Sequence, residues 1–365
     1  MSAIPRIARA PLTSKQPGAC PHCGSHNVSR RGTRKKKLEI VQLWRCASCK
    51  RVFTPGPAPL HNKTYPLRMI LSALTDYHLG YSLHDTAKRL KKKTNRTVSP
   101  STITNWLREY RQHCSYARLR TAGLKRFPPE QTIRSVKLYH RQIYAYGYHR
   151  PKLEFLRTGK LDDKREGTQT STVRFTSLAN YLENIPTTCP HDLFRRDDDP
   201  KARASQAQPD FADVSRIIVN RKENAATDTA ALIIPAVGNN KLRHETLQRF
   251  MLATDSVTIA IEIPIWLDEP DMQALERQHG IELAPKTSAP RAITGHIDFL
   301  QVRNGAVHIL DYKPDARTNK PIAQLAIYAL ALTRLVPGLK LFDIKCSWFN
   351  EEEYCEFFPR TLFAR

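Results

Sequence analysis

The chain contains 365 residues, of which 41% are hydrophobic, and its formal net charge at pH 7 is +24. This length is sufficient for two or three domains, each able to bury a core. No run of about 18 apolar residues is present, and the first residues lack the apolar segment of a secretory signal. We therefore expect no membrane span and no secretion.

The positive charge is concentrated in the N-terminal third of the chain. Residues 1–130 contain 26 Lys and Arg but only 5 Asp and Glu, whereas the chain beyond residue 174 is close to neutral. A charge that served only solubility would be spread more evenly, so this segregation predicts binding to a polyanion, usually nucleic acid. We expect double-stranded DNA as a partner and a cytoplasmic, nucleoid-associated location.

Patterns along the chain predict five segments. Residues 1–17 form a basic tail, residues 18–58 contain paired cysteines, and residues 59–115 have the periodicity of three helices. Residues 116–215 are expected to be a basic region, helical in parts, that ends in a polar linker. Residues 216–365 alternate helix and strand patterns, as in an α/β domain with a central mixed sheet. The fold class expected is thus multidomain: a small β unit, an all-α unit and an α/β domain.

The first motif is a double cysteine pair. Cys20 and Cys23 form one C-x-x-C, and Cys46 and Cys49 form a second one after 22 intervening residues. This spacing predicts one structural zinc ion held by four thiolates on a β-hairpin, a zinc ribbon, with redox-active dithiols as the alternative. Basic residues on or near the turn of this hairpin are expected to contact DNA: Arg34, Lys35, Lys36 and Lys37.

The three expected helices have clear start signals. Ser82 and Ser99 are suited to cap the second and third helices, and Pro100 suits the first turn of the third. Polar residues near the start of a recognition helix contact base edges in the major groove of DNA. A helix-turn-helix is therefore expected, with an ordinary helical bundle as the alternative. The expected DNA-contacting residues are Ser101, Thr102, Thr104, Asn105 and Arg108.

Together, CPHCGS, RCASCKRVFTPG and VSPSTITNWLREY resemble the N-terminal DNA-binding part of insertion-sequence transposases. The resemblance covers about the first 115 residues and implies DNA binding in a mobile-element setting. In such transposases an RNase-H-like domain follows. Since we find no such pattern in the later sequence, the chemistry of transposases is not carried over.

A β-hairpin with a chemically suggestive set of residues is expected near residues 292–313. Its turn is Asn304-Gly305, a strong hairpin signal. The two-residue period of a strand places Asp311 and Lys313 on one face about 7 Å apart, while Asp298 comes from the adjacent strand. Converging carboxylates repel each other unless a cation lies between them, and Mg²⁺ takes oxygen ligands. We therefore expect one or two Mg²⁺ or Mn²⁺ ions.

The set GHID, LDYK and Gln324-x-x-x-Tyr328 resembles the PD-(D/E)xK nuclease superfamily, in particular its RecB-like branch. The resemblance implies a metal held by Asp298, Asp311 and the backbone carbonyl of Tyr312, with Lys313 assisting catalysis. It also implies that Gln324 and Tyr328, which share a helix face, lie beside the site and contact DNA or orient the catalytic groups. The Pro that usually precedes the first Asp is absent here.

The resemblance further implies a ligand from the helix that precedes the first strand. His244 is the preferred choice and Glu245 is its rival. Glu262 is a third candidate, because a carboxylate in the middle of an apolar strand, opposite the expected face of Ile259, Ile261 and Ile263, needs a partner. Some RecB-like nucleases carry an iron–sulfur cluster, but the spacing of the remaining cysteines does not fit one. We interpret Cys114, Cys189, Cys346 and Cys355 as buried or surface thiols.

The Tyr-rich stretch 136–150 fits either base stacking or packing between domains. Taken together, the patterns predict a Mg²⁺-dependent deoxyribonuclease directed to DNA by its own N-terminal unit, in a mobile-element or genome-defence setting. A homodimer is attractive, because one such site cuts one strand, and a transposition, recombination or defence protein is a further expected partner. The alternatives are a DNA-binding regulator with an inactive nuclease fold and a subunit that cuts only with a partner.

Overall fold

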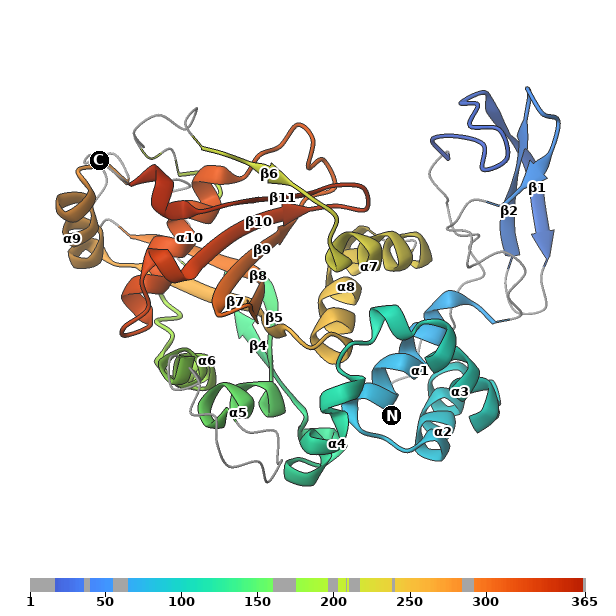
Figure 1. Cartoon of the computed structure of the whole chain (residues 1–365), viewed down its shortest axis with the longest axis horizontal. Helices are drawn as coiled ribbons and strands as arrows, with labels where there is room; N and C mark the ends of the chain where they lie inside the picture. Colours follow the sequence, from blue (N-terminus) through green and yellow to red (C-terminus); the bar gives the residue numbers. More distant parts are fainter. Residues whose placement is uncertain are drawn as a thin grey trace.

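The structure is a computed structural model, and it describes residues 17–35, 40–54, 65–159, 175–195, 203–207, 209, 217–237, 240–283 and 292–363. Residues 1–16 of the expected basic tail lie outside this part of the chain. The described residues form a small antiparallel sheet and a large mixed sheet, together with many helices. Figure 1 shows the small sheet standing apart from the rest of the molecule. The architecture is thus multidomain α/β, as expected.

The small sheet has the order β1-β2-β3 and surrounds a minimal core. Its strands are β1 (Val28–Lys35), β2 (Ile40–Cys46) and β3 (Val52–Phe53). Val28, Trp44 and Phe53 are buried together with Cys20 and Cys46. So few apolar side chains cannot stabilise a unit of this size without a cross-link or a metal ion.

Three helices follow, as the periodicity predicts: α1 (Leu67–Leu79), α2 (Leu83–Thr94) and α3 (Pro100–Glu109). Ser82 Oγ accepts a hydrogen bond from the backbone N–H of Asp85, and Ser99 Oγ accepts one from Thr102, each at 3.1 Å. Both predicted N-caps are therefore formed. We call α1–α3 the three-helix unit.

The three-helix unit shares its core with one face of the large sheet. Helices α7 (Ala225–Ile233) and α8 (Asn240–Thr254) lie between this unit and the sheet (Figure 1). One cluster of buried side chains runs from Leu74 and Trp106 through Phe250 of α8 to Leu310 of the sheet. A continuous close-packed core is stiff, so α3 has a fixed orientation relative to the sheet.

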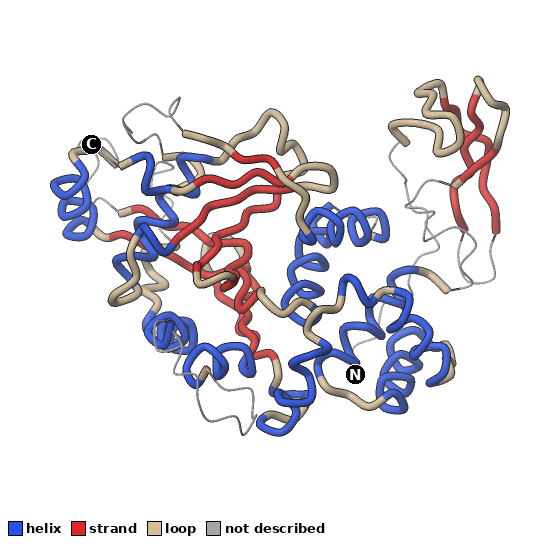
Figure 2. Tube along the Cα trace, viewed as in Figure 1, coloured by secondary structure: helices blue, strands red, loops and turns tan. Residues whose placement is uncertain are grey.

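The large sheet has the strand order β4-β5-β7-β8-β9-β10-β11-β6. Strands β9 and β10 are parallel, and the other pairs that we describe are antiparallel. Figure 2 shows these strands as one twisted sheet with helices on both sides. The strands are β4 (Ile133–Tyr139), β5 (Ile143–His149), β6 (Asn220–Arg221), β7 (Thr258–Leu267), β8 (Ile293–Arg303), β9 (Ala306–Tyr312), β10 (Ile344–Phe349) and β11 (Tyr354–Phe357).

The second face of the sheet is covered by α6 (Thr176–Thr188), α9 (Glu269–His279) and α10 (Ile322–Leu335), whose buried residues form a second core cluster. Helix α10 joins the parallel strands β9 and β10, as a crossover connection requires. The shorter helical elements are α4 (Ala117–Arg126), α5 (Arg150–Thr158) and the 3₁₀ turns Arg111–His113, Pro129–Gln131, Ile234–Ala236, Leu341–Asp343 and Pro359–Leu362.

The middle region differs from the sequence-based expectation. We expected residues 116–215 to be a basic helical and linker region, yet they contribute strands β4 and β5 to the large sheet through the pairing Gly147↔Ile261. The reason is burial: Leu138, Tyr146 and Tyr148 are buried in the core of the sheet. Tyr146 and Tyr148 therefore pack within the core of the large sheet, which differs from the expected packing between domains, while Tyr139 is 59% exposed.

Even the expected linker contributes to the sheet at one point, because Ala204 N–H donates a hydrogen bond to the carbonyl of Thr294 in β8. No helix in the described part of the chain has the length and apolar character needed to cross a membrane.

Candidate functional site

The β8–β9 hairpin brings the expected acids together. Its turn residues Asn304 and Gly305 are both left-handed, with φ of 51° and 70°, as the Asn-Gly signal predicts. The backbone N–H of Tyr312 donates to Asp298 Oδ2 at 3.0 Å, and Lys313 Nζ lies 2.9 Å from Asp311 Oδ2. The two carboxylates and the ammonium group thus converge at the end of β9.

Helix α8 and strand β7 add two further groups. His244 Nε2 lies 2.8 Å from Asp298 Oδ2, and His244 Nδ1 lies 3.7 Å from Glu262 Oε1. The candidate ligand atoms of His244, Glu262 and Asp298 all lie within 4.8 Å of one another, which is close enough for one metal ion. Glu245 is exposed and lies 3.5 Å from Arg249. The structure therefore brings His244 and Glu262 to the acids and turns Glu245 away. We call His244, Glu262, Asp298, Asp311 and Lys313 the acidic cluster.

Glu262 reaches the cluster through an unusual backbone conformation. Its φ is +52°, which is left-handed and rare for a residue within a strand. The alternation of β7 is broken at the register shift between Thr258 and Ala260 and again at Glu262. Ile259 and Ile263 therefore pack in the core beneath α10, whereas Ile261 packs in the core beneath α8. The expectation that the three isoleucines share one face is therefore wrong. Backbone strain of this kind is common at functional sites.

The acidic cluster contains more carboxyl groups than cationic side chains. Burial and the nearby Asp298 raise the pKa of Asp311 to about 8 despite the Lys313 ammonium, and they raise the pKa of Glu262 to about 7. Burial would lower the pKa of His244, but Asp298 and Glu262 outweigh it and raise that pKa to about 9. The carboxyl of Asp311 is buried, and its Oδ2 forms an ion pair with Lys313 Nζ at 2.9 Å. Three carboxyl groups facing two cationic side chains fit a site that takes an additional cation.

Burial would also raise the pKa of Asp298, but its partners hold it below the usual range. The cause is the imidazole of His244, followed by the N–H of Tyr312 and the ammonium of Lys313. Asp298 therefore stays ionised and is well suited to bind a cation.

Helix α10 supports the hairpin from the other face. Gln324 Nε2 donates to the hydroxyl of Tyr328 at 2.8 Å, so the i, i+4 pair shares one face as expected. Tyr328 is buried against Gly295, three residues before Asp298. A Cβ at Gly295 would lie 2.5 Å from Tyr328 Cε1, so only glycine fits there without displacement of the ring.

Gln248 is part of the site but was not expected from the sequence. Its Nε2 donates to Glu262 Oε1 at 2.7 Å and lies 3.3 Å from the carbonyl of Asp298. Gln248 follows His244 by four residues on α8, so the i, i+4 rule could have found it once His244 was chosen. It links the two strands that carry the acids.

The four cysteines of the two pairs converge on the small sheet. The sulfur atoms of Cys20 and Cys49 lie 3.6 Å apart, as do those of Cys23 and Cys46, and all four lie within 4.8 Å of one another. Thiolates bound tetrahedrally at about 2.3 Å from a zinc ion are separated by about 3.8 Å. The backbone N–H of Cys49 faces Cys46 Sγ and lowers the pKa of that thiol to about 6. These residues could hold one zinc ion.

The expected DNA-contacting residues differ in their exposure to solvent. On α3, Ser101, Asn105 and Arg108 are exposed, and Arg108 donates to Asn105 Oδ1 at 3.3 Å. Thr102 and Thr104 are half-buried, and Thr104 Oγ1 donates to the carbonyl of Pro100. Arg34 is exposed on β1. Only the backbone of Lys35 is described, and Lys36 and Lys37 lie outside the described residues.

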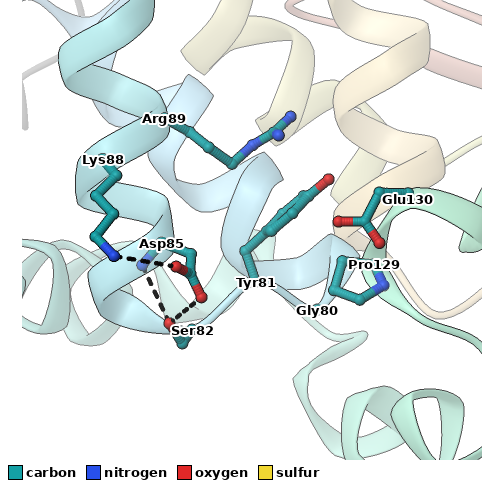
Figure 3. A pocket seen from close by; sticks show the side chains of 8 residues that line it. All are labelled: Gly80, Tyr81, Ser82, Asp85, Lys88, Arg89, Pro129 and Glu130. Atoms are coloured by element: carbon teal, nitrogen blue, oxygen red, sulfur yellow. Dashed lines mark hydrogen bonds and ion pairs between the residues drawn. The ribbon is translucent and has the colours of Figure 1, made fainter.

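A polar hollow of about 570 Å³ opens beside the start of α2 (Figure 3). Arg89 stacks on the ring of Tyr81 at 3.9 Å, and Ser82 and Asp85 close the N-terminal end of the helix. None of the lining residues belongs to the acidic cluster. The hollow therefore lies between the three-helix unit and the turn Pro129–Gln131, and it contributes nothing to the chemistry of that cluster.

Protein-family models, curated proteins and solved structures show no significant match to this chain. The interpretation of the site therefore depends on its own geometry.

Proposed function

We propose that this protein is a metal-dependent DNA nuclease that hydrolyses phosphodiester bonds. The observation that carries the proposal is the convergence of His244, Asp298, Asp311 and Lys313 at one end of the β8–β9 hairpin. Oxygen-rich ligands from two carboxylates, with an adjacent lysine, are the chemistry that a phosphodiester hydrolase needs.

The donor set fits Mg²⁺ or Mn²⁺. Asp298 and Asp311 would hold one or two such ions, with the carbonyl of Tyr312 and with His244 and Glu262 as further ligands. The bound ion supplies a water of lowered pKa and polarises the phosphate. The buried carboxyl of Asp311 favours this occupancy, because a cation would relieve its repulsion by the nearby Asp298.

The other residues of the site would position the reacting groups and stabilise the charge that develops during the reaction. Lys313 Nζ would donate a hydrogen bond to the nucleophile or to the phosphate oxygen on which negative charge develops. Gln248 bridges β7 and β8 and would keep Glu262 aimed at the ligands. Gln324 and Tyr328 would hold α10 against the hairpin and so orient the catalytic groups.

The N-terminal units would direct the nuclease to DNA. A zinc ribbon on the four cysteines and a helix-turn-helix with Ser101, Asn105 and Arg108 on its outer face are both supported by the geometry. Because the three-helix unit and the sheet share one core, binding by α3 would place the cut at a defined distance from the recognised sequence. We assign the protein to a mobile-element or genome-defence setting at the nucleoid, acting as a homodimer or with a transposition, recombination or defence protein.

The test is nicking of supercoiled plasmid DNA with Mg²⁺ and with Mn²⁺. We expect Asp311→Ala to reduce cleavage by at least about 100-fold while DNA affinity in a gel-shift assay is unchanged. Glu245→Gln is the matched control, because Glu245 is an acid on the same helix as His244 but is exposed and faces away. Its cleavage rate should equal that of the wild type.

Binding is tested separately. Arg108→Ala should weaken DNA binding by about 1–3 kcal/mol and relax the choice of site, with the metal dependence of any cleavage unchanged. If the wild type and Asp311→Ala are equally inactive with both metals and with every partner tried, the nuclease proposal fails. The DNA-binding regulator would then be the better explanation.

A further inference from the structure

Three histidines far apart in the sequence form a continuous row beside β8. His140 follows β4, His191 follows α6 and His296 lies within β8. Nδ1 of His140 lies 2.8 Å from Nε2 of His296, and Nε2 of His140 lies 2.9 Å from Nδ1 of His191. We call these residues the imidazole row. Both ring nitrogens of His140 are thereby engaged by another imidazole.

A cysteine completes one end of the row. Cys189 precedes His191 by two residues and is 6% exposed. The ligand atoms of His140, Cys189 and His191 all lie within 4.8 Å of one another, as do those of the four ribbon cysteines. The three residues come from two separate segments of the chain, so tertiary packing alone brings them together.

The rings are held in place by aromatic stacking. Phe194 stacks on His140 with 4.1 Å between ring centroids and 17° between planes. Tyr144 stacks on His296 at 3.5 Å and 9°. A side chain clamped in this way loses little further freedom when it binds a ligand, so the site is preorganised.

The imidazole row offers nitrogen donors, and the charged side chain that acts on its central member, His140, is the guanidinium of Arg195. Burial, with help from His191 and Arg195, lowers the pKa of His140 to about 4, so this imidazole is neutral near pH 7. Burial raises the pKa of the Cys189 thiol to about 12. A neutral imidazole offers a lone pair to a metal ion, and a thiol gives up its proton when it binds one.

We propose that His140, Cys189 and His191 form a second zinc site, distinct from the four-cysteine site and from the acidic cluster. Two imidazole nitrogens and one thiolate are typical ligands of this borderline-soft ion, whereas Mg²⁺ prefers oxygen. Binding releases the Cys189 proton, and the hydrogen shared between His140 and His191 moves to the outer nitrogen of His191. The fourth position is left for water or another donor.

His296 acts from outside the site. A metal-bound histidine commonly donates its other N–H to a neighbouring acceptor, which fixes the ring and its tautomer. His296 Nε2 is placed to accept from Nδ1 of His140. The ion would thereby link the β4–β5 hairpin and the end of α6 to β8. The point of attachment is His296, two residues before Asp298. The proposal does not depend on nuclease activity.

The test is the zinc content of the full chain after dialysis against micromolar free zinc, measured by inductively coupled plasma mass spectrometry. We expect two zinc ions per wild-type chain and one in each of Cys189→Ser and His191→Ala. Cys114→Ser is the matched control, since Cys114 is also buried and burial also raises the pKa of its thiol to about 12. It should retain two ions. Cys49→Ser should lose the ion of the small sheet.

Three further outcomes decide against the proposal. A single zinc ion in the wild type overturns it, as does unchanged zinc in both Cys189→Ser and His191→Ala. Loss of the second ion in Asp298→Ala but not in His191→Ala would assign it to the acidic cluster instead. If Cys189→Ser does not fold, His191→Ala still decides, because His191 is half-exposed and its removal leaves little empty space.

Discussion

Gly295→Ala tests directly how closely α10 packs against the β8–β9 hairpin. A Cβ at this position would lie 2.5 Å from Cε1 and 3.1 Å from the hydroxyl oxygen of Tyr328. An ordinary carbon–carbon contact needs about 3.5 Å, so the ring must move by about 1 Å. Tyr328 is 4% exposed and its hydroxyl accepts from Gln324, which leaves little room for that movement.

The expected cost follows from this overlap. Overpacking of a core typically destabilises a protein by about 1–3 kcal/mol, which for a domain of this size lowers the melting temperature by roughly 2–12 °C. Gly147→Ala is the matched control, because Gly147 also lies in a strand of the large sheet. There a Cβ would meet its nearest neighbours at 3.5 Å, an ordinary contact. Its melting temperature should be unchanged or slightly higher, since alanine restricts the unfolded chain.

Thermal and urea unfolding followed by far-ultraviolet circular dichroism measures both variants. A double-mutant cycle with Tyr328→Leu isolates the contact, because leucine lacks the ring atom that collides. The double variant should be more stable than the sum of the single effects predicts, by about 1 kcal/mol or more. Equal stability of Gly295→Ala and Gly147→Ala, or strict additivity in the cycle, would refute the packing argument.

Three further outcomes follow from other parts of the chain. Ser99→Ala removes the N-cap of α3 and should lower the free energy of unfolding, measured in urea, by about 1 kcal/mol. Ser101→Ala, on the exposed face of the same helix, should change it by no more than about 0.5 kcal/mol. A larger loss for Ser101→Ala than for Ser99→Ala would contradict the capping role. Cys49→Ser, which should lose only the zinc ion of the small sheet, should unfold that sheet and weaken DNA binding, yet leave the unfolding transition of the large sheet in place, as followed by circular dichroism and gel shift. Loss of both transitions together would show that the units are not independent. Burial lowers the pKa of Lys152 from 10.5 to about 8 despite Asp255, so the folded state holds this proton less tightly than the unfolded chain. The stability of the wild type relative to Lys152→Met should therefore rise between pH 8 and 10, with a full span on the order of 3 kcal/mol, and a flat difference in that window would show that the lysine is not buried as a cation.

Local patterns in the sequence were sufficient for several elements. The C-x-x-C spacing predicted the cluster of Cys20, Cys23, Cys46 and Cys49, and the Asn304-Gly305 turn predicted the hairpin. Each of these features depends on residues that are neighbours in sequence or on a turn whose backbone geometry is set by its own residues. The N-caps of α2 and α3 follow for the same reason.

Other features depend on contacts between distant segments. Helix periodicity could not choose between His244 and Glu245, because adjacent helical residues differ by 100° in direction and only the position of the sheet decides which one faces it. The left-handed conformation of Glu262 could not be predicted from its strand, since the partner of its side chain, Gln248, lies on α8 and meets it only in the folded chain. Similarly, β4 and β5 form a local hairpin, but its place in the large sheet depends on the pairing of β5 with β7, more than 100 residues away.

The sequence by itself therefore determined which chemical groups the chain carries and the local shapes that present them: four thiols on a hairpin, acids and a lysine on paired strands, and a capped third helix. Tertiary structure decided which of those groups meet. It brought His140, Cys189 and His191 together and moved Glu245 out of the acidic cluster. The physical reason is that backbone preferences act over a few residues, whereas burial in a shared core is settled only when the whole chain has packed.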